Sequence, residues 1–501
     1  MSSGPAAPVG SVAVIGAGLA GLSAAMHLRA AGVHVTVLEA AAAPGGRAAR
    51  TNRAGFSLDV GPTVITLPDV LADCFAALGE ELSDHLRLLP VDPAYVARMH
   101  DGSTLALTTD VEVMAERVRA FSGPRDADGY LRLVAHLRAI YRAELPHFID
   151  RNLDSPLSLV NRPLLDIVRL RGFSRLAKVM ASFFEDERLR RAFGFQAMYA
   201  GVAPSSALGL FAVITAMDLI EGVVYPVGGI NAVPTAMATA LESHGVEIRY
   251  GTTVSSVRED TRDVLVTDAD GRSDRYDSVV LTCEPEAAAT LLGDHTSRTL
   301  RRRRQMSPSC VVLAAGVDHR LPVEAHHTIH LGRAWDEVFV DLAEGRPMRD
   351  PSFLVSVPTR TDPSIAPAGG DVLYALFPTP HLRHQHPLDW RRLRAPYREH
   401  MLHHLAAAGM GDLSGSFEVE ELITPDDWRR RGFADGTPLS AAHTFMQTGP
   451  FRTPNRLSSR LVLAGSGTTP GIGVPMVLIS GRLAAERLVG RDPSYRSRAW
   501  R

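Results

Sequence analysis

Apolar positions near the start of the chain change period in a way that predicts a strand, a helix and a second strand. Residues 12–15 form an unbroken apolar run, which is typical of a parallel strand covered on both faces. Apolar residues then recur at helical spacing from position 22 onward, until Gly32 supplies a C-terminal stop. Residues 33–38 predict a second strand that ends at Glu39. The pattern indicates the beginning of a βαβ unit.

The rest of the chain divides into a mainly helical part and a part where strands and helices alternate again. Between about 80 and 225, apolar recurrence every three to four residues predicts helices over 112–121, 128–141, 164–184 and 207–219. A Gly-Gly turn at 228–229 and a helix ending at 243 follow, and short strands are predicted over 246–250, 264–267, 278–281 and 461–464. Prolines between 351 and 380 indicate loops in a less regular stretch.

The order of these elements predicts one α/β domain that is assembled from separated segments and interrupted by insertions. We assign 1–80, 226–300 and 446–501 to this domain. The insertions make a second domain, with a mainly helical part over 81–225 and a continuation over 301–445.

Composition and charge remove several classes of function. The 501 residues include 53 basic and 55 acidic side chains, for a net charge of −2, so we expect no nucleic-acid partner. Three distant cysteines, Cys74, Cys283 and Cys310, argue against a disulfide framework and favour a reducing cytosol. Lys178 is the only lysine, which excludes a Walker A motif and most Schiff-base chemistry. We expect neither a secretory signal nor a membrane-spanning segment.

The junction between the first strand and the first helix carries a dinucleotide-binding pattern. Gly16 permits the tight turn, Gly18 lets the backbone approach a pyrophosphate, and Gly21 lets the helix pack closely on the strand. The helix N-terminus favours the phosphate charge, and Glu39 is placed to accept hydrogen bonds from ribose hydroxyls. An accidental glycine turn is the competing interpretation.

Three further loops favour a flavin dinucleotide over a nicotinamide one. Gly45-Gly46-Arg47 predicts a second phosphate-facing loop with a bidentate donor, and Gly61-Pro62-Thr63 a backbone-exposing loop. The C-terminal segment 465–476 predicts a helix that begins near Gly473 and aims its amides at a flavin ring. An ordinary strand-loop-helix connection also fits that segment. The predicted cofactor-binding residues are Gly16, Ala17, Gly18, Gly21, Glu39, Gly46, Arg47, Gly61, Pro62, Thr63, Val254, Gly465, Gly467, Gly473, Val474, Pro475 and Met476.

Together these motifs resemble those of the bacterial phytoene desaturase family of carotenoid biosynthesis, whose FAD enzymes are related in fold to monoamine oxidases. The resemblance covers nearly the whole chain. Its motifs are the segments 12–22, 45–47, 61–66, 187–193, 225–229 and 465–475. It departs from the family pattern at Ser466 and Thr469, where alanine and histidine are common in the family.

The resemblance implies an α/β fold with a Rossmann-like FAD-binding domain of the glutathione-reductase/monoamine-oxidase type, built from discontinuous segments, and an inserted α+β domain for substrate and membrane contact. It implies FAD as the sole tightly bound cofactor. It also implies a long apolar C40 polyene as substrate, into which double bonds are introduced, and a cytoplasmic protein that contacts a membrane peripherally.

The chemistry of such a reaction asks for an apolar tunnel and a proton acceptor. The dense apolar stretch between 193 and 217 suits a tunnel lining, and we name Phe195, Tyr199, Phe211 and Met217 as substrate residues. Ordinary helix packing explains the same stretch equally well. Asp218 closes it and is the candidate proton acceptor, with a solvated helix end as the alternative.

Apolar and basic residues alternate over 164–180 in a pattern that suits an amphipathic helix on an anionic bilayer, although a surface helix facing the protein core also fits. Histidines cluster near 326–330, 381–386 and 400–404 without partners at zinc-site spacing, so we expect no metal.

The competing functions are a carotene isomerase, a hydroxyneurosporene-type desaturase, an amine oxidase, and a non-enzymatic isoprenoid-binding protein of the Rab GDP-dissociation-inhibitor type.

Overall fold

The computed structural model describes residues 9–153, 155–159, 161–293, 299–492, 495 and 497–500. One half of the molecule is built on a five-stranded parallel sheet in the order β10-β2-β1-β14-β20. The strands are β1 (Ser11–Ile15), β2 (His34–Leu38), β10 (Glu247–Arg249), β14 (Ser278–Leu281) and β20 (Leu461–Leu463). They come from three separated parts of the chain, 11–38, 247–281 and 461–463.

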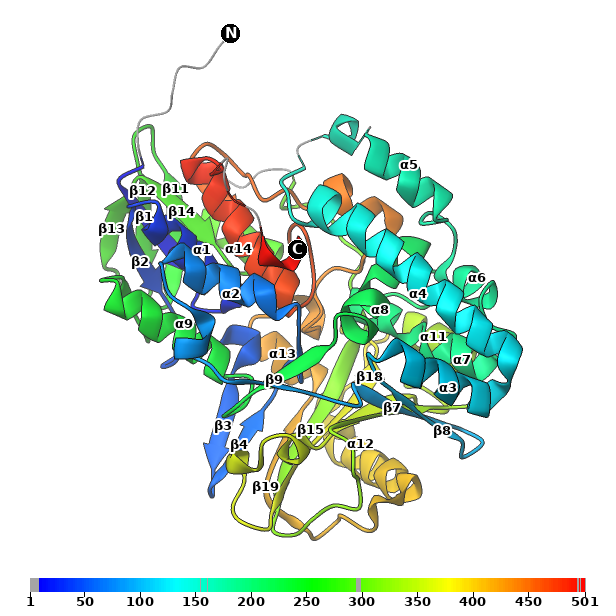
Figure 1. Ribbon diagram of the computed structural model, residues 1–501. Helices are drawn as coiled ribbons and strands as arrows, with labels where there is room; N and C mark the ends of the chain where they lie inside the picture. The colour runs from blue at the N-terminus through cyan, green and yellow to red at the C-terminus, as the bar shows by residue number, and fades with distance from the viewer. Residues whose placement is uncertain are drawn as a thin grey trace.

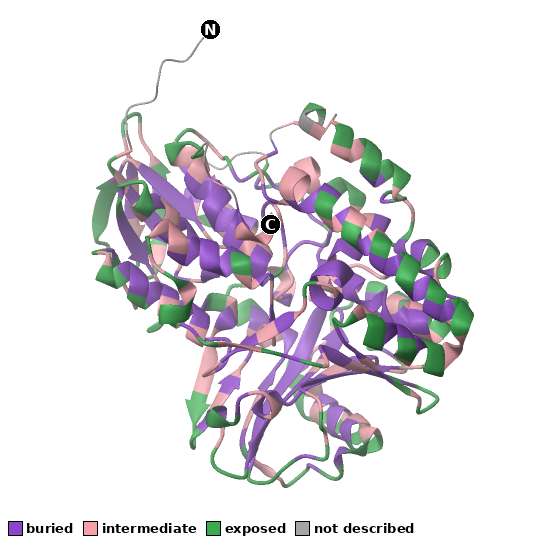
Figure 2. Cartoon of the chain, viewed as in Figure 1, coloured by how far each residue is buried: buried purple, intermediate pink, exposed green. Residues whose placement is uncertain are grey.

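Helices cover one face of this sheet, where α1 (Leu19–Ala30) packs against α14 (Val474–Val489) from the other end of the chain. Figure 1 shows the red α14 beside the blue α1 and α2 (Pro68–Ala77), with α9 (Ala232–Ser243) below them. A three-stranded antiparallel sheet of β11 (Val254–Glu259), β12 (Val264–Asp268) and β13 (Ser273–Tyr276) lies at this end of the molecule, and α10 (Pro285–Leu292) contacts β11. In Figure 2 most residues of the parallel strands are purple, because both faces of the sheet are covered, whereas the edge strand β10 has only exposed and intermediate residues.

A seven-stranded mixed sheet forms the other half, in the order β19-β15-β18-β17-β16-β7-β8. Its strands are β7 (Tyr95–Met99), β8 (Thr104–Leu107), β15 (Ser309–Val317), β16 (His327–Leu331), β17 (Phe353–Ser356), β18 (Asp371–Thr379) and β19 (Phe417–Ile423). Small sheets of β3 (Arg50–Arg53) with β4 (Phe56–Asp59), and of β5 (Ile65–Thr66), β9 (Val223–Pro226) and β6 (Leu88–Pro90), complete the β structure.

Helices α3 (Val111–Ser122), α4 (Pro124–Glu144), α5 (Arg162–Arg169), α6 (Leu176–Ala181), α7 (Glu187–Ala192) and α8 (Ala212–Leu219) gather on the right of the molecule in Figure 1. The remaining helices, α11 (Trp335–Ala343), α12 (Trp390–Leu405) and α13 (Pro425–Arg430), come from the second long insertion. Buried residues of the parallel sheet, the helical part and the mixed sheet belong to one continuous hydrophobic core.

Two predictions about secondary structure are wrong in an informative way. The single helix predicted over 164–184 is broken between α5 and α6, because Arg171 adopts a positive φ of 59° and Gly172 packs against Ile167. The proline-rich stretch predicted as loops contains β17 and β18 of the mixed sheet. Strand β18 is buried along almost all of its nine residues, so pairing on both sides overrides the local proline signal.

Candidate cofactor and substrate site

One large cavity of about 1250 Å³ runs between the two halves of the molecule. It is lined at one end by the strand-to-helix loops of the parallel sheet and at the other by the helical part and the mixed sheet. Pockets for a single small ligand usually measure about 300–1,000 Å³. The cavity is therefore large enough for a dinucleotide and a second molecule together.

The dinucleotide end of the cavity is shaped by the turn between β1 and α1. A carboxylate oxygen of Glu39 accepts a hydrogen bond from the Ala17 amide at 2.6 Å, and its other oxygen accepts one from the Ala41 amide at 2.8 Å. A Cβ built on Gly21 would lie 2.0 Å from the Gly16 carbonyl oxygen, so only glycine lets helix and strand approach this closely. Gly16 and Glu39 line the cavity, whereas Ala17 and Gly21 stand behind it and fix the turn.

Unlike Gly21, Gly18 occupies a position where the fold does not require a glycine. Its φ of −76° and ψ of 171° are open to any residue. A Cβ at this position would meet only the Cα of Gly46, at 3.9 Å, on the facing loop. The two loops touch, because the Gly45 amide donates a hydrogen bond to the Ala17 carbonyl at 3.0 Å. Gly18 and Gly46 both line the cavity beside this contact, so their backbones are accessible to a ligand's phosphates.

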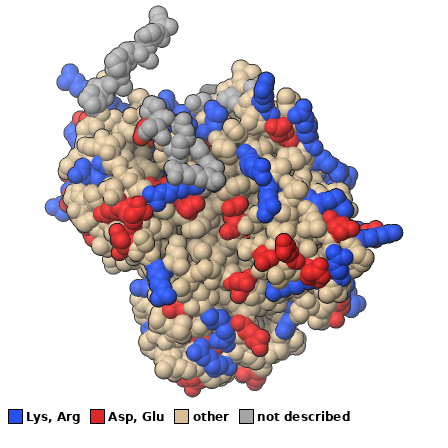
Figure 3. All heavy atoms as spheres, in the orientation of Figure 1, with Lys and Arg blue, Asp and Glu red and all other residues tan. Residues whose placement is uncertain are grey.

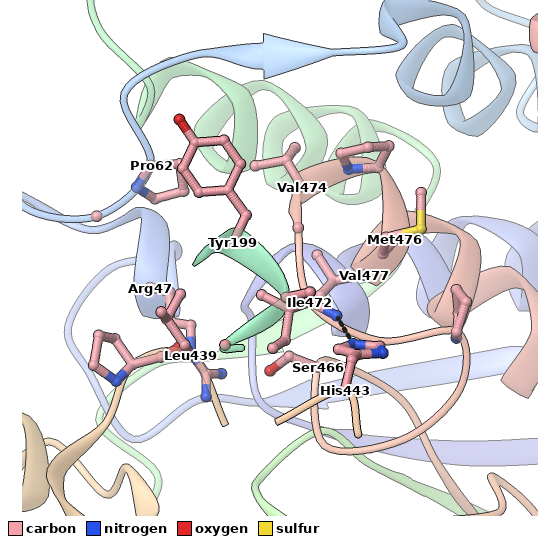
Figure 4. A pocket seen from close by; sticks show the side chains of 18 of the residues that line it. Arg47, Pro62, Tyr199, Leu439, His443, Ser466, Ile472, Val474, Met476 and Val477 are labelled. Carbon is pink, nitrogen blue, oxygen red and sulfur yellow. Dashed lines mark hydrogen bonds between the residues drawn. The ribbon is translucent and has the colours of Figure 1, made fainter. Parts of the chain in front are cut away.

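Arg47 lines the cavity, as Figure 4 shows, but its guanidinium group is engaged with the protein. Its guanidinium forms an ion pair with Glu284, donates to the Pro438 carbonyl at 2.8 Å and stacks 4.3 Å from the centre of the Phe433 ring. Glu284 is buried and also accepts a hydrogen bond from Ser440 at 2.6 Å. The expected bidentate phosphate donor is thus engaged with the protein, and it ties the Gly45-Gly46 loop to the end of β14.

A partly buried carboxylate just before the Gly61-Pro62-Thr63 loop joins it to a distant turn. Asp59 accepts hydrogen bonds from the Ile230 amide at 2.6 Å and the Tyr225 hydroxyl at 3.2 Å, and burial raises its pKa to about 6. These bonds fasten β4 to the Gly228-Gly229 turn. The contact explains why two sequence motifs more than 160 residues apart occur together.

The flavin-facing end is formed by the segment between β20 and α14. Figure 4 shows Ser466, Ile472, Val474 and Met476 around the cavity, together with His443, whose Nε2 accepts a hydrogen bond from the Ile472 amide at 3.4 Å. The buried Ser466 hydroxyl faces the cavity without a hydrogen-bond partner. Gly465, Gly473 and Pro475 also line the cavity, and Gly467 instead packs against Pro285.

Beyond this end the cavity becomes apolar. Phe195, Tyr199, Phe211 and Met217, the four substrate residues named from the sequence, all line it. The Phe195 ring lies edge-on to Tyr199, with 5.9 Å between ring centres, and Ile329, Leu331 and Leu376 of the mixed sheet contribute to the wall.

Asp218 lies in the wall of this apolar part. Its side chain is buried, and one carboxylate oxygen accepts a hydrogen bond from the Tyr95 hydroxyl at 3.2 Å. Burial raises the pKa of Asp218 to about 7. Because the group exchanges its proton near neutral pH, it is suited to acid–base chemistry. Glu221, three residues later, is exposed and lies outside the cavity wall.

The apolar part reaches the surface beside α5. Val168, Phe173 and Phe445 line the cavity and are also 54%, 44% and 50% exposed, which marks them as its rim. Leu165 and Met446 extend this exposed apolar surface. In Figure 3, basic side chains gather at the upper right, where α5 lies in Figure 1. Among the described residues, no helix is long and apolar enough to cross a membrane.

Most of the predicted cofactor residues line one cavity, including Thr63 and Val254, which begins β11 close to Glu39. The sequence interpretation missed Glu284, Ser440, Tyr95 and His443. No motif surrounds these residues, and only the pairing of distant segments brings them to the site.

Comparisons with known proteins agree with this arrangement. Residues 19–489 match the model of the flavin-containing amine oxidoreductase family. The chain is 47% identical to a phytoene dehydrogenase of Streptomyces griseus, with 96% of each chain covered. It is 36% identical to a zeta-carotene-forming phytoene desaturase of Myxococcus xanthus, covering 95% of this chain and 93% of the relative. The chain belongs to the flavin-containing amine oxidoreductase family.

Solved structures show the same fold at low sequence identity. A putrescine oxidase superposes with a TM-score of 0.64 at 16% identity, and the match covers 97% of this chain and 100% of the putrescine oxidase. Cyclohexylamine oxidase from Brevibacterium oxydans superposes with a TM-score of 0.59 at 17% identity, covering 95% of this chain and 98% of that one. The expectation of an α/β fold related to flavin amine oxidases is confirmed.

Proposed function

We propose that the protein is an FAD-dependent carotenoid desaturase that introduces conjugated double bonds into phytoene or a closely related C40 carotene. The observation that carries the proposal is the continuity of the cavity, which joins a dinucleotide crevice to a long apolar chamber. The relatives named as phytoene dehydrogenase and phytoene desaturase support the choice of substrate.

The residues at the dinucleotide end fit FAD. Glu39 would hold the ribose, the Gly18 and Gly46 backbones would face the pyrophosphate, and the N-terminus of α14 with Ser466 would face the flavin. The unpartnered Ser466 hydroxyl and the accessible backbone at Gly18 favour an extended polar ligand beside the loops. When bound, the cofactor supplies the acceptor for the hydride that leaves the substrate.

The chain supplies a dry chamber and a proton acceptor. Desaturation removes a hydride from one carbon and a proton from its neighbour, so positive charge develops on the polyene and must be kept from water. Phe195, Phe211 and Met217 exclude water and orient the chain. Asp218 is placed to accept the proton in its carboxylate form, and Tyr95 holds that carboxylate toward the cavity.

The exposed rim at Val168, Phe173 and Phe445 is where we propose that a hydrocarbon substrate enters from a membrane surface. A C40 hydrocarbon does not diffuse through water, and the basic residues near α5 suit anionic lipid headgroups. The broken segment α5–α6 gives a shorter amphipathic surface than the sequence predicts.

The test is incubation of the purified flavoprotein with phytoene-loaded liposomes while the polyene absorption spectrum is followed. We expect the spectrum to shift to longer wavelength as conjugation grows. A yellow, flavin-loaded protein that leaves phytoene unchanged but consumes an amine would refute the proposed substrate.

A further inference from the structure

Four carboxyl groups line the cavity, and three of them have partners in the protein. Glu39 accepts backbone hydrogen bonds, Glu284 pairs with Arg47, and Asp218 accepts a hydrogen bond from Tyr95. Glu144 is the exception among the described residues. Its side chain is only 4% exposed, and its Oε1 atom is buried without a hydrogen-bond partner.

Glu144 belongs to the helical part of the cavity wall. It is the last residue of α4, and the chain continues from it into the π-helical turn Leu145–Ile149. Phe148, Ile149 and Leu153, which follow it, line the cavity on the same side as α5. Glu144 is thus a polar group in the apolar arm of the cavity, beside the segment that leads to the rim.

A buried polar group without a partner is costly and calls for an explanation. Burial raises the pKa of Glu144 well above its ordinary value, and no positive or hydrogen-bonding group opposes the effect. This shift favours the protonated carboxylic acid, which has an O–H group to donate. A pure hydrocarbon in this arm cannot accept that hydrogen bond.

We propose that Glu144 recognises an oxygen atom carried by an otherwise apolar chain, by donating a hydrogen bond to its hydroxyl or carbonyl group. The inference rests on the proposed function, because it places such a ligand in the arm that would hold the polyene. Two sources share this chemistry: a carotenoid with an oxygenated end, and an isoprenoid quinone. The absence of a second acid or a cation cage beside Glu144 favours a neutral ligand over an amine.

The test compares the flavin-loaded wild type with Glu144→Leu, which removes the donor, and Glu144→Gln, which keeps an N–H donor. Each protein is titrated with three ligands in detergent: a C40 hydrocarbon carotene, the same polyene with one terminal hydroxyl, and a quinone with an isoprenoid tail. Binding is followed by polyene absorbance for the first two ligands and by quenching of flavin fluorescence for the quinone. Glu221→Leu, at an exposed glutamate outside the cavity, is the matched control.

We expect Glu144→Leu to weaken binding of at least one oxygenated ligand about tenfold, while hydrocarbon binding is unchanged or tighter. Glu144→Gln should keep most of the preference. The ligand that loses affinity identifies the source, the hydroxylated polyene or the quinone. An equal loss for hydrocarbon and oxygenated ligands would overturn the proposal.

Ligand binding by the wild type alone also tests the proposal, even if the Glu144 variants do not fold. If it binds the hydroxylated polyene and the quinone no better than hydrocarbons of the same length, the proposal fails. Turnover of the hydrocarbon carotene by Glu144→Leu would still support the proposed desaturase, so the two failures can be told apart.

Discussion

Replacing Gly18 with valine separates the demands of folding from those of cofactor binding. The backbone at Gly18 is ordinary, and a Cβ there would make only an ordinary van der Waals contact, 3.9 Å from the Cα of Gly46. The apoprotein should therefore fold with a free energy of unfolding within about 1 kcal/mol of the wild type. The valine methyl groups would instead crowd the part of the cavity beside Gly18 and Gly46 that we assign to the pyrophosphate.

Gly18→Val should mainly weaken the affinity for FAD. A hydrogen bond to a charged group is worth about 1.5–3 kcal/mol, so losing two amide–phosphate bonds costs about 3–6 kcal/mol. At 1.4 kcal/mol per factor of ten, this weakens binding roughly 10²–10⁴-fold. The variant should purify as colourless apoprotein and require a large excess of FAD for any recovery.

The assay is flavin absorbance per mole of purified protein, followed by thermal unfolding of both proteins after the flavin is stripped. Gly415→Val is the control, because Gly415 is exposed and a Cβ there meets no atom within 4 Å. Full flavin content in Gly18→Val would refute the placement of the pyrophosphate. A large loss of stability in the stripped variant would refute the claim that this glycine serves the ligand alone.

Three other changes test neighbouring parts of the site. Gly21→Ala should destabilise the fold itself, because its Cβ would lie 2.0 Å from the Gly16 carbonyl oxygen; chemical denaturation of the apoprotein measures this. Asp218→Asn should keep its flavin but lose about 10²–10⁴-fold in turnover, and Glu221→Gln is its control. Wild-type turnover should rise as pH passes about 7, where Asp218 ionises, and a flat profile would contradict its role as base. Phe445→Glu at the exposed rim should reduce co-flotation with anionic vesicles while flavin content stays normal; unchanged flotation would move the membrane contact elsewhere.

The pKa of Asp218 also fixes the sign of a stability effect. Since burial raises this pKa from 3.8 to about 7, the folded state keeps its proton where the unfolded chain has lost it. The contribution of Asp218 to stability is complete below pH 3.8 and is lost as pH rises to about 7. Relative to Asp218→Asn, the wild type should therefore lose free energy of unfolding across that window.

The parts of the site that could be predicted from the sequence are those determined by local structure. The turn at Gly16, the acidic end of β2 at Glu39 and the start of α14 at Gly473 each depend on residues within one strand-loop-helix unit. Their spacing therefore appears in the sequence. The broken helix at Arg171 and the buried strand β18 depend instead on contacts with distant segments, so local periodicity predicts them wrongly.

Local sequence patterns also do not show which acidic residues act in the site. Asp218 and Glu221 both lie at the end of an apolar stretch, and only the structure shows that Asp218 is bonded to Tyr95, more than 120 residues earlier in the chain. Glu144 was not distinguished at all, because an acid at the end of a long helix is usually solvated.

Asp218 and Glu144, the two acids of the apolar chamber, differ mainly in their hydrogen-bond partners. This difference suits them to different roles. Tyr95 donates to Asp218, which lowers the cost of the carboxylate and brings its pKa to about 7, where the group can gain and lose a proton during turnover. Nothing offsets the burial of Glu144, which raises its pKa well above the ordinary value and favours the protonated form that can donate from its O–H group. A catalytic base must be able to lose its proton within the cavity. A group that donates a hydrogen bond to a neutral oxygen atom must instead keep its proton. The hydrogen bond from one tyrosine therefore separates the proposed catalytic acid from the proposed recognition acid within a single cavity.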